Sequence, residues 1–166
     1  MTKGLALAAH PGLDAGTLGA LRAARAVALA RRHGSPIGLE VDDAGRQVTM
    51  ALSFDPPDAR ARASWADRDR TTEWAAEAIA LEVLHELRGM GAILRAARGT
   101  RFDWYVGPSG ADFEAAVALE VGGTDERRVE GVLARKLRQI RRRAGGLPGI
   151  AAAVQFLTRR AMFRDG

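Results

Sequence analysis

The chain has 166 residues, a length that favours a single domain spanning 1–166 with its own buried core. It contains no cysteine, which excludes disulfides and thiol chemistry and predicts a cytoplasmic location, and no window approaches the roughly 18 to 20 uncharged apolar residues of a membrane helix. The net charge of +5 lies entirely in residues 125–145, where eight basic residues meet three acidic ones, and this favours either a polyanionic partner or a solvated basic helix face.

Residues 14–33 are predicted to form the first helix. Asp14 or Thr17 can accept a hydrogen bond from the first turn, and the Gly34–Pro36 stretch ends the helical pattern. Apolar side chains recur at helical spacing and predict one buried stripe, made of Leu18, Leu21, Val27 and Ala28.

A β-hairpin is predicted next. The segments 37–41 and 46–54 are rich in strand-forming residues, and the turn at 42–45 between them has the sequence Asp-Asp-Ala-Gly. Residues 55–70 are rich in turn-forming and charged residues, which predicts a linker.

The second part of the chain has a more regular pattern. Residues 71–89 predict a helix that begins at Thr71 or Thr72 and ends at Gly89, and residues 124–144 predict another helix. Four apolar segments predict strands at 92–97, 102–107, 113–122 and 149–158.

Two of these predicted strands contain a carboxylate. Asp103 lies at the start of "FDWYVG" and Glu120 lies within "ALEVGG". Together with the order helix, three strands, helix, strand over residues 71–158, this placement resembles the PD-(D/E)XK nuclease superfamily, whose motif has an Asp at the start of the second core strand and (D/E)-X-K in the third. The resemblance implies an α/β (α+β) fold with a restriction-endonuclease-like core, to which residues 1–60 add an N-terminal helix and β-hairpin.

The chain departs from the motif at its lysine. Gly122 stands where the motif has Lys, and Lys136 is the only lysine in this half of the chain. At about 100° per residue, Lys136 falls inside the apolar arc of its helix, so its ammonium needs a carboxylate partner such as Glu120. Some members of the superfamily carry the motif lysine on this helix, so the resemblance implies that Lys136 is the displaced catalytic lysine.

The first core helix supplies a candidate third carboxylate. Glu73 and Glu77 both fall inside its apolar arc, at about 260° and 300° from Trp74. Glu73 is preferred because it lies in the first turn, where the helix dipole favours negative charge. An inward Glu at this place often completes the acidic site of the superfamily.

The resemblance implies a metal-dependent nuclease that hydrolyses phosphodiester bonds of DNA, or less readily RNA, in a phage-defence or toxin–antitoxin setting. Asp103, Glu120 and Glu73 would bind Mg²⁺ or Mn²⁺ through oxygen, and Lys136 would take part in catalysis beside them. Contacts with the nucleic-acid backbone are expected from the second core helix, through Gln139, Arg128, Arg135, Arg138 and Arg142.

Two other functions stay open from the residues alone. The same fold can act as a non-catalytic module that binds nucleic acid or a partner protein, as a homodimer or beside a larger subunit, and the inward charges can form a purely structural ion-pair network. Each site residue also has a plain structural role available. Asp103 can end a turn, Glu120 can lie on an exposed strand face, Lys136 can reach water along the apolar face, and Glu73 can be an ordinary first-turn charge.

Overall fold

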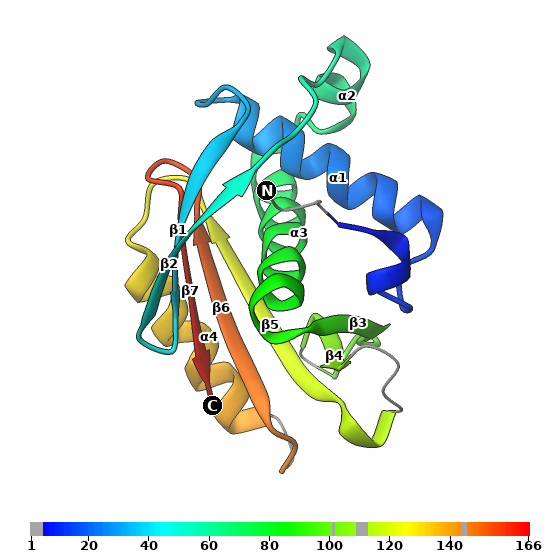
Figure 1. The fold of residues 1–166 in the computed structure, drawn as a ribbon, viewed down its shortest axis with the longest axis vertical. Helices are drawn as coiled ribbons and strands as arrows, with labels where there is room; N and C mark the ends of the chain where they lie inside the picture. Colours follow the sequence, from blue (N-terminus) through cyan, green and yellow to red (C-terminus); the bar gives the residue numbers. More distant parts are fainter. Residues whose placement is uncertain (1–4, 101, 109–112, 144–145) are drawn as a thin grey trace.

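The computed structural model describes residues 5–100, 102–108, 113–143 and 146–166, and in these ranges one seven-stranded mixed sheet runs through the middle of the molecule (Figure 1). The strands lie in the order β2-β1-β7-β6-β5-β4-β3. Their bounds are β1 Ile37–Asp43, β2 Arg46–Leu52, β3 Met90–Arg95, β4 Trp104–Pro108, β5 Val117–Thr124, β6 Gly149–Gln155 and β7 Arg160–Asp165. With four α-helices in the described residues, the fold belongs to the mixed α/β class.

The predicted first helix and hairpin are both confirmed. Helix α1 spans Ala15–Ala30 after a short 3-10 turn at Leu7–Ala9, and the Asp14 carboxylate accepts a hydrogen bond from Thr17 N at 2.7 Å. Its predicted apolar stripe is buried. Strands β1 and β2 pair antiparallel through a turn in which Ala44 and Gly45 both have positive φ, as a type I′ hairpin requires.

The predicted linker at 55–70 is wrong. Helix α2 spans Ala59–Ser64, and helix α3 spans Arg68–Arg88, so the third helix begins before Thr71. The caps are Asp58, which accepts from Ala61 N, and Asp67, which accepts from Arg70 N. Aspartates that suggested turns are therefore helix caps, since the same short side chain serves both purposes.

The predicted element order over the second half is confirmed, with shifted bounds. Helix α3 is followed by β3, β4 and β5, then by helix α4 at Val129–Arg143 and by β6. Helix α4 begins after residue 124 because β5 continues to Thr124, and the predicted end of this helix at 144 lies outside the described residues. β5 and β6 are parallel, with α4 as their crossover, whereas β3–β4 and β4–β5 are antiparallel.

Strand β7 was not predicted, and it decides how the N-terminal hairpin is attached. β7 pairs antiparallel with β6 on one side and parallel with β1 on the other. The hairpin therefore extends the same sheet as the second half of the chain.

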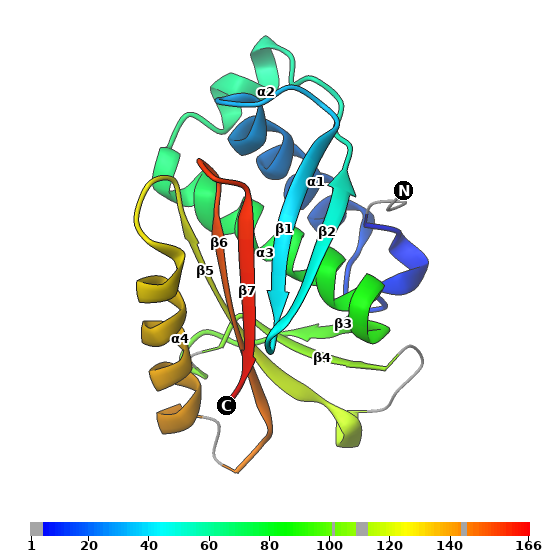
Figure 2. The same cartoon turned by 60° about the vertical axis from the view of Figure 1, so that its left-hand side comes forward.

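Helices lie on both faces of the sheet (Figures 1 and 2), and the sheet separates two apolar cores. Helices α1 and α3 lie over one face, where the larger core includes Trp104, Leu119 and Val121. Helix α4 covers the other face, where Val132 and Ile140 pack on the small side chains of β5 and β6. Among the described helices, none combines the length and the apolar character that crossing a membrane would require.

Candidate functional site

The ion pair between Glu120 and Lys136 lies on the α4 face of the sheet. Lys136 Nζ donates to Glu120 Oε1 at 2.6 Å, and the two side chains are only 16% and 7% exposed. A Cβ atom at Gly122 would lie 2.5 Å from Val132 Cγ1 and 3.1 Å from Lys136 Cε. The lysine stem on α4 therefore fills the space beside Gly122, and the predicted inward direction of Lys136 is confirmed.

Asp103 lies directly before β4, next to this pair. Its backbone N donates to Leu119 O at 3.0 Å, and its Oδ2 accepts from Val121 N at 2.7 Å. The β4–β5 pairing ends at Leu119, so the carboxylate satisfies a β5 amide just beyond the paired stretch. Continuing the Trp104–Leu119 register by one residue places Asp103 beside Glu120.

Glu77, rather than Glu73, is the α3 carboxylate directed at the sheet. Glu77 is buried, and its Oε2 accepts from Trp104 Nε1 at 2.9 Å and lies 3.3 Å from Arg95 Nη2. Glu73 is exposed. The helical arc contained both residues, but the preference for the first turn selected the one that lies farther from the sheet core.

Burial and the Asp103 carboxylate disfavour the charged form of Glu77. Burial, followed by the nearby Asp103 carboxylate, raises the pKa of Glu77 to about 7, although Arg95 and the Trp104 indole partly oppose the shift. Burial also raises the pKa of Asp103, opposed by the Val121 N–H and by the Lys136 and Arg95 charges. Asp103 and Glu77 are thus two poorly solvated carboxyl groups whose negative charges are only partly balanced by nearby cations and hydrogen-bond donors. Such groups with raised pKa values are frequent at functional sites.

Arg95 is a component that the sequence did not indicate. It lies at the end of β3, and its guanidinium carbon is 4.9 Å from the ring centroids of both Trp74 and Trp104. This double cation–π contact holds a partly exposed cation against Glu77. A single arginine on a short strand has no periodic pattern around it, so only the packed structure reveals its position.

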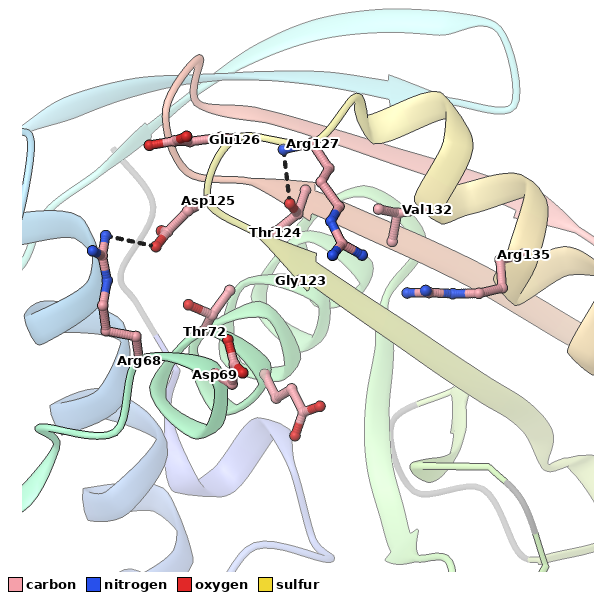
Figure 3. Close-up of a pocket in the computed structure, with 11 residues that line it drawn as sticks. Arg68, Asp69, Thr72, Gly123, Thr124, Asp125, Glu126, Arg127, Val132 and Arg135 are labelled. Atoms are coloured by element: carbon pink, nitrogen blue, oxygen red, sulfur yellow. Dashed lines mark hydrogen bonds and ion pairs between the residues drawn. The ribbon is translucent and has the colours of Figure 1, made fainter.

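A pocket of about 610 Å³ opens between the first turn of α3 and the start of α4 (Figure 3). Glu73 and Arg135, two of the predicted site residues, line it, and Arg127 and Arg135 extend into it from the α4 side. Its floor includes Gly123, where a Cβ atom would meet Thr72 O at 2.5 Å, so glycine allows α3 to approach β5 closely. Asp103, Glu120 and Lys136 are not lining residues: Glu120 precedes Gly123 on β5, Lys136 follows Arg135 on α4, and Asp103 lies before β4.

The other predicted contact residues lie mainly at the surface of α4. Gln139 is partly buried, and its Oε1 is buried without a hydrogen-bond partner among the described residues. Arg128 pairs only distantly with Glu130, at 3.9 Å. All four predicted contact arginines are exposed to solvent: Arg128, Arg135, Arg138 and Arg142.

The acidic residues suit a hard divalent cation in their chemistry. Carboxylate oxygens are the ligands that Mg²⁺ prefers, and a cation near Asp103 would relieve its repulsion with Glu77. Within the described part of the chain, no group of three or more His, Cys, Asp or Glu side chains is assembled to hold a metal ion. The residues therefore fit the cation by donor type, while the described residues do not form a complete set of three ligands.

Comparisons of the chain with protein-family models, with curated proteins and with solved structures find no match. The function therefore has to be inferred from the geometry of the chain itself.

Proposed function

We propose that this chain is a metal-dependent nuclease with a restriction-endonuclease-like core. The observation that carries the proposal is the meeting of Asp103, Glu120 and Lys136 at two neighbouring strands and the helix that covers them. Lys136 binds Glu120 at 2.6 Å and is close enough to Asp103 for its charge to oppose the rise in the pKa of that carboxyl. The order of elements from α3 to β6 further supports the proposal.

The space beside Gly122 supports the assignment of Lys136 as the displaced lysine. Any side chain at position 122 would collide with Val132 and with the Lys136 stem, so the strand and the helix cannot both supply a lysine here. The glycine and the helical lysine therefore form one arrangement, in which α4 delivers the ammonium that the strand lacks.

In this proposal Asp103 and Glu120 would hold Mg²⁺ or Mn²⁺, with Glu77 as the auxiliary acid in place of Glu73. When bound, the cation supplies Lewis-acid polarisation of the phosphodiester and neutralises charge at the leaving oxygen. Lys136 would donate hydrogen bonds to the attacked phosphate and stabilise its added negative charge. Its link to Glu120 holds the ammonium in one orientation before substrate arrives.

The pocket beside the site would receive part of the nucleic-acid backbone. Arg127 and Arg135 extend into it, and guanidinium groups bind phosphate oxygens in a bidentate way. Glu73 on the opposite wall would then lie at the rim, facing solvent. The substrate in this proposal is DNA in preference to RNA.

The test compares wild type with Asp103→Asn for cleavage of plasmid and of single-stranded DNA in Mg²⁺ or Mn²⁺. Asn can still accept from Val121 N, so the variant removes the charge and keeps the local hydrogen bond. We expect cleavage to fall by on the order of 100-fold or more, as when one group that stabilises a transition state is lost. Asp165→Asn, an exposed acid at the far end of β7, is the matched control. Undiminished cleavage by Asp103→Asn, or cleavage that persists in EDTA, would refute the proposal.

The second candidate is a non-catalytic module of the same fold that binds nucleic acid or a protein. The favouring observation is that Lys136 already engages Glu120 and that no three-ligand acidic group is assembled in the described residues. This candidate predicts strongly salt-dependent DNA binding with no cleavage under any divalent ion, because phosphate contacts release counterions.

A further inference from the structure

Three aromatic side chains form an open cluster at the end of the sheet. The ring centroids of Phe102 and Tyr105 are 5.8 Å apart in an edge-to-face arrangement, and those of Tyr105 and Phe113 are 5.0 Å apart. Phe113 is 54% exposed, more than any other large apolar side chain in the described residues. Only nine residues of the chain are Phe, Trp or Tyr, so a third of them gather in this cluster, in which Phe102 and Tyr105 are half-buried and Phe113 is exposed.

The cluster lies on the same side of the sheet as the ion pair of Glu120 and Lys136. Side chains alternate along a strand, and Trp104 points to the α3 face, where it binds Glu77. Tyr105, the next residue along β4, therefore points to the α4 face, and its pairing partner Ala118 belongs to the core under α4. Phe102 packs beside the core that lies under α4.

Exposed arginines of α4 flank this side of the sheet. Lys136 marks the flank of the helix that faces β5, and Glu130, paired with Arg160 at 2.7 Å, marks the opposite flank towards β7. Taking Val129 as 0°, Arg135 and Arg142 fall at about 240° and 220°, whereas Glu130 falls at about 100°. Arg135 therefore lies nearer the flank of Lys136, whereas Arg142 lies midway between the two flanks, and both side chains are exposed.

We propose that Phe102, Tyr105 and Phe113, here named the aromatic platform, stack on unpaired bases of single-stranded nucleic acid held by the α4 arginines. Base stacking needs free ring faces, which a duplex keeps inside its own stack, so the platform selects single strands or unpaired segments. Positive charge beside the platform favours a polyanion over an apolar protein surface, because interface cores between proteins are depleted of charge. The inference deepens the proposed function and rests on it for the position of the reacting phosphate.

The experiment measures binding in EDTA, so that cleavage cannot interfere. Fluorescence anisotropy with the full chain compares three labelled ligands: a short single strand, its duplex, and a strand of equal length and charge with abasic residues at its centre. Wild type should bind the intact single strand at least tenfold more tightly than the abasic one. Phe113→Leu should remove about tenfold of this preference, because stacking on an aromatic ring is lost. Leu157→Ala, at another exposed apolar position, is the matched control and should change nothing.

Comparing the intact strand with the abasic strand separates a loss of base stacking from a loss of folded structure in each variant. A variant that merely unfolds would lose affinity for the abasic strand as well, and Tyr105→Leu offers a second position at which only the base-dependent part should fall. Arg135→Ala should weaken binding of both strands and lower the salt dependence, because it removes a phosphate contact.

The outcomes distinguish this inference from the proposed function. Base-dependent binding that needs Phe113, without cleavage in Mg²⁺ or Mn²⁺, would support the platform and contradict the nuclease. Cleavage of duplex DNA that Phe113→Leu leaves unchanged, together with equal affinity for intact and abasic strands, would support the nuclease and overturn the platform. A change in oligomeric state in Phe113→Leu with unaltered strand binding would also overturn it, by assigning the cluster to self-association.

Discussion

The pKa values of buried carboxyl groups are shifted in opposite directions at the two ends of the sheet. At the β1–β7 end, Asp42 forms a two-pronged ion pair with Arg164, at 2.8 and 2.9 Å, and hydrogen bonds from Arg164 lower the pKa of Asp42 to about 2. At the β4–β5 end, burial raises the pKa of Asp103. Burial and the nearby Asp103 charge raise the pKa of Glu77 to about 7. One end is electrostatically satisfied, while the other holds acids whose charges are only partly compensated.

This difference separates structural ion pairs from a candidate site. A carboxylate that only supports the fold gains from a partner that favours its charged form, as Asp42 does. Acids kept in a dry region with raised pKa values reduce stability at neutral pH, and such an arrangement is expected where a cation or a proton is to be bound. The β4–β5 end is therefore where chemistry should be sought.

Removing Lys136 should have the largest effect. Lys136→Met takes the ammonium from the largely buried Glu120 carboxylate, and loss of one member of such a pair should cost about 2–4 kcal/mol of unfolding free energy. Under the proposed function, cleavage should also fall by on the order of 100-fold, since charge stabilisation of the attacked phosphate is lost. Urea unfolding and plasmid cleavage measure the two effects.

The double variant Lys136→Met with Glu120→Gln sharpens the result. It should recover much of the lost stability, because no carboxylate is left beside the apolar side chain, and it should remain inactive. Full activity in the folded single variant Lys136→Met would show that Lys136 has only a structural role, like the ion pairs at the β1–β7 end. The two ends of the sheet would then no longer differ in function.

Asp42→Asn probes the satisfied end and should have the next largest effect. The pKa of Asp42 is lowered to about 2, so its ionised form stabilises the fold above the ordinary pKa near 4, and this contribution is lost as pH falls towards 2. We expect the variant to be about 1–2 kcal/mol less stable at pH 7 and equal to wild type near pH 2. Urea unfolding across this range tests it; a difference independent of pH would show that charge is not the cause.

Glu77→Gln should have an effect of similar size but of the opposite sign. Because the pKa of Glu77 is raised to about 7, the folded state binds its proton more tightly than the unfolded chain, and wild-type stability falls as pH rises from about 4.5 to 7. The variant lacks this loss and should be about 1–2 kcal/mol more stable than wild type at pH 8, with little difference at pH 4. Unfolding at both pH values measures this.

Glu73→Gln, at an exposed position on the same helix, is the control for this prediction and should be neutral at both pH values. If Glu77→Gln instead destabilises the protein at pH 8, its contacts with Arg95 and Trp104 outweigh the repulsion, and both ends of the sheet would be structural in character.

Local patterns in the sequence were sufficient for several features of this protein. Helical periodicity alone placed Lys136 on the inner face of α4, and the same periodicity placed Glu77 inside the arc of α3. The hairpin turn at 42–45 and the cap at Asp14 likewise follow from residues a few positions apart. These features depend on φ/ψ preferences and on 3.6- or 2-residue repeats, which any short segment carries within itself.

Tertiary structure alone decided the rest. The choice of Glu77 over Glu73 depends on which turn of α3 meets Trp104, the contact of Arg95 with two tryptophans depends on strand register, and the attachment of the N-terminal hairpin depends on β7. Helix axes and strand registers are set by packing between segments far apart in the chain, which one segment's periodicity does not encode. The sequence by itself thus determined that Lys136 and Glu77 fall on inward helix faces, and the packed sheet determined which charges are buried and meet.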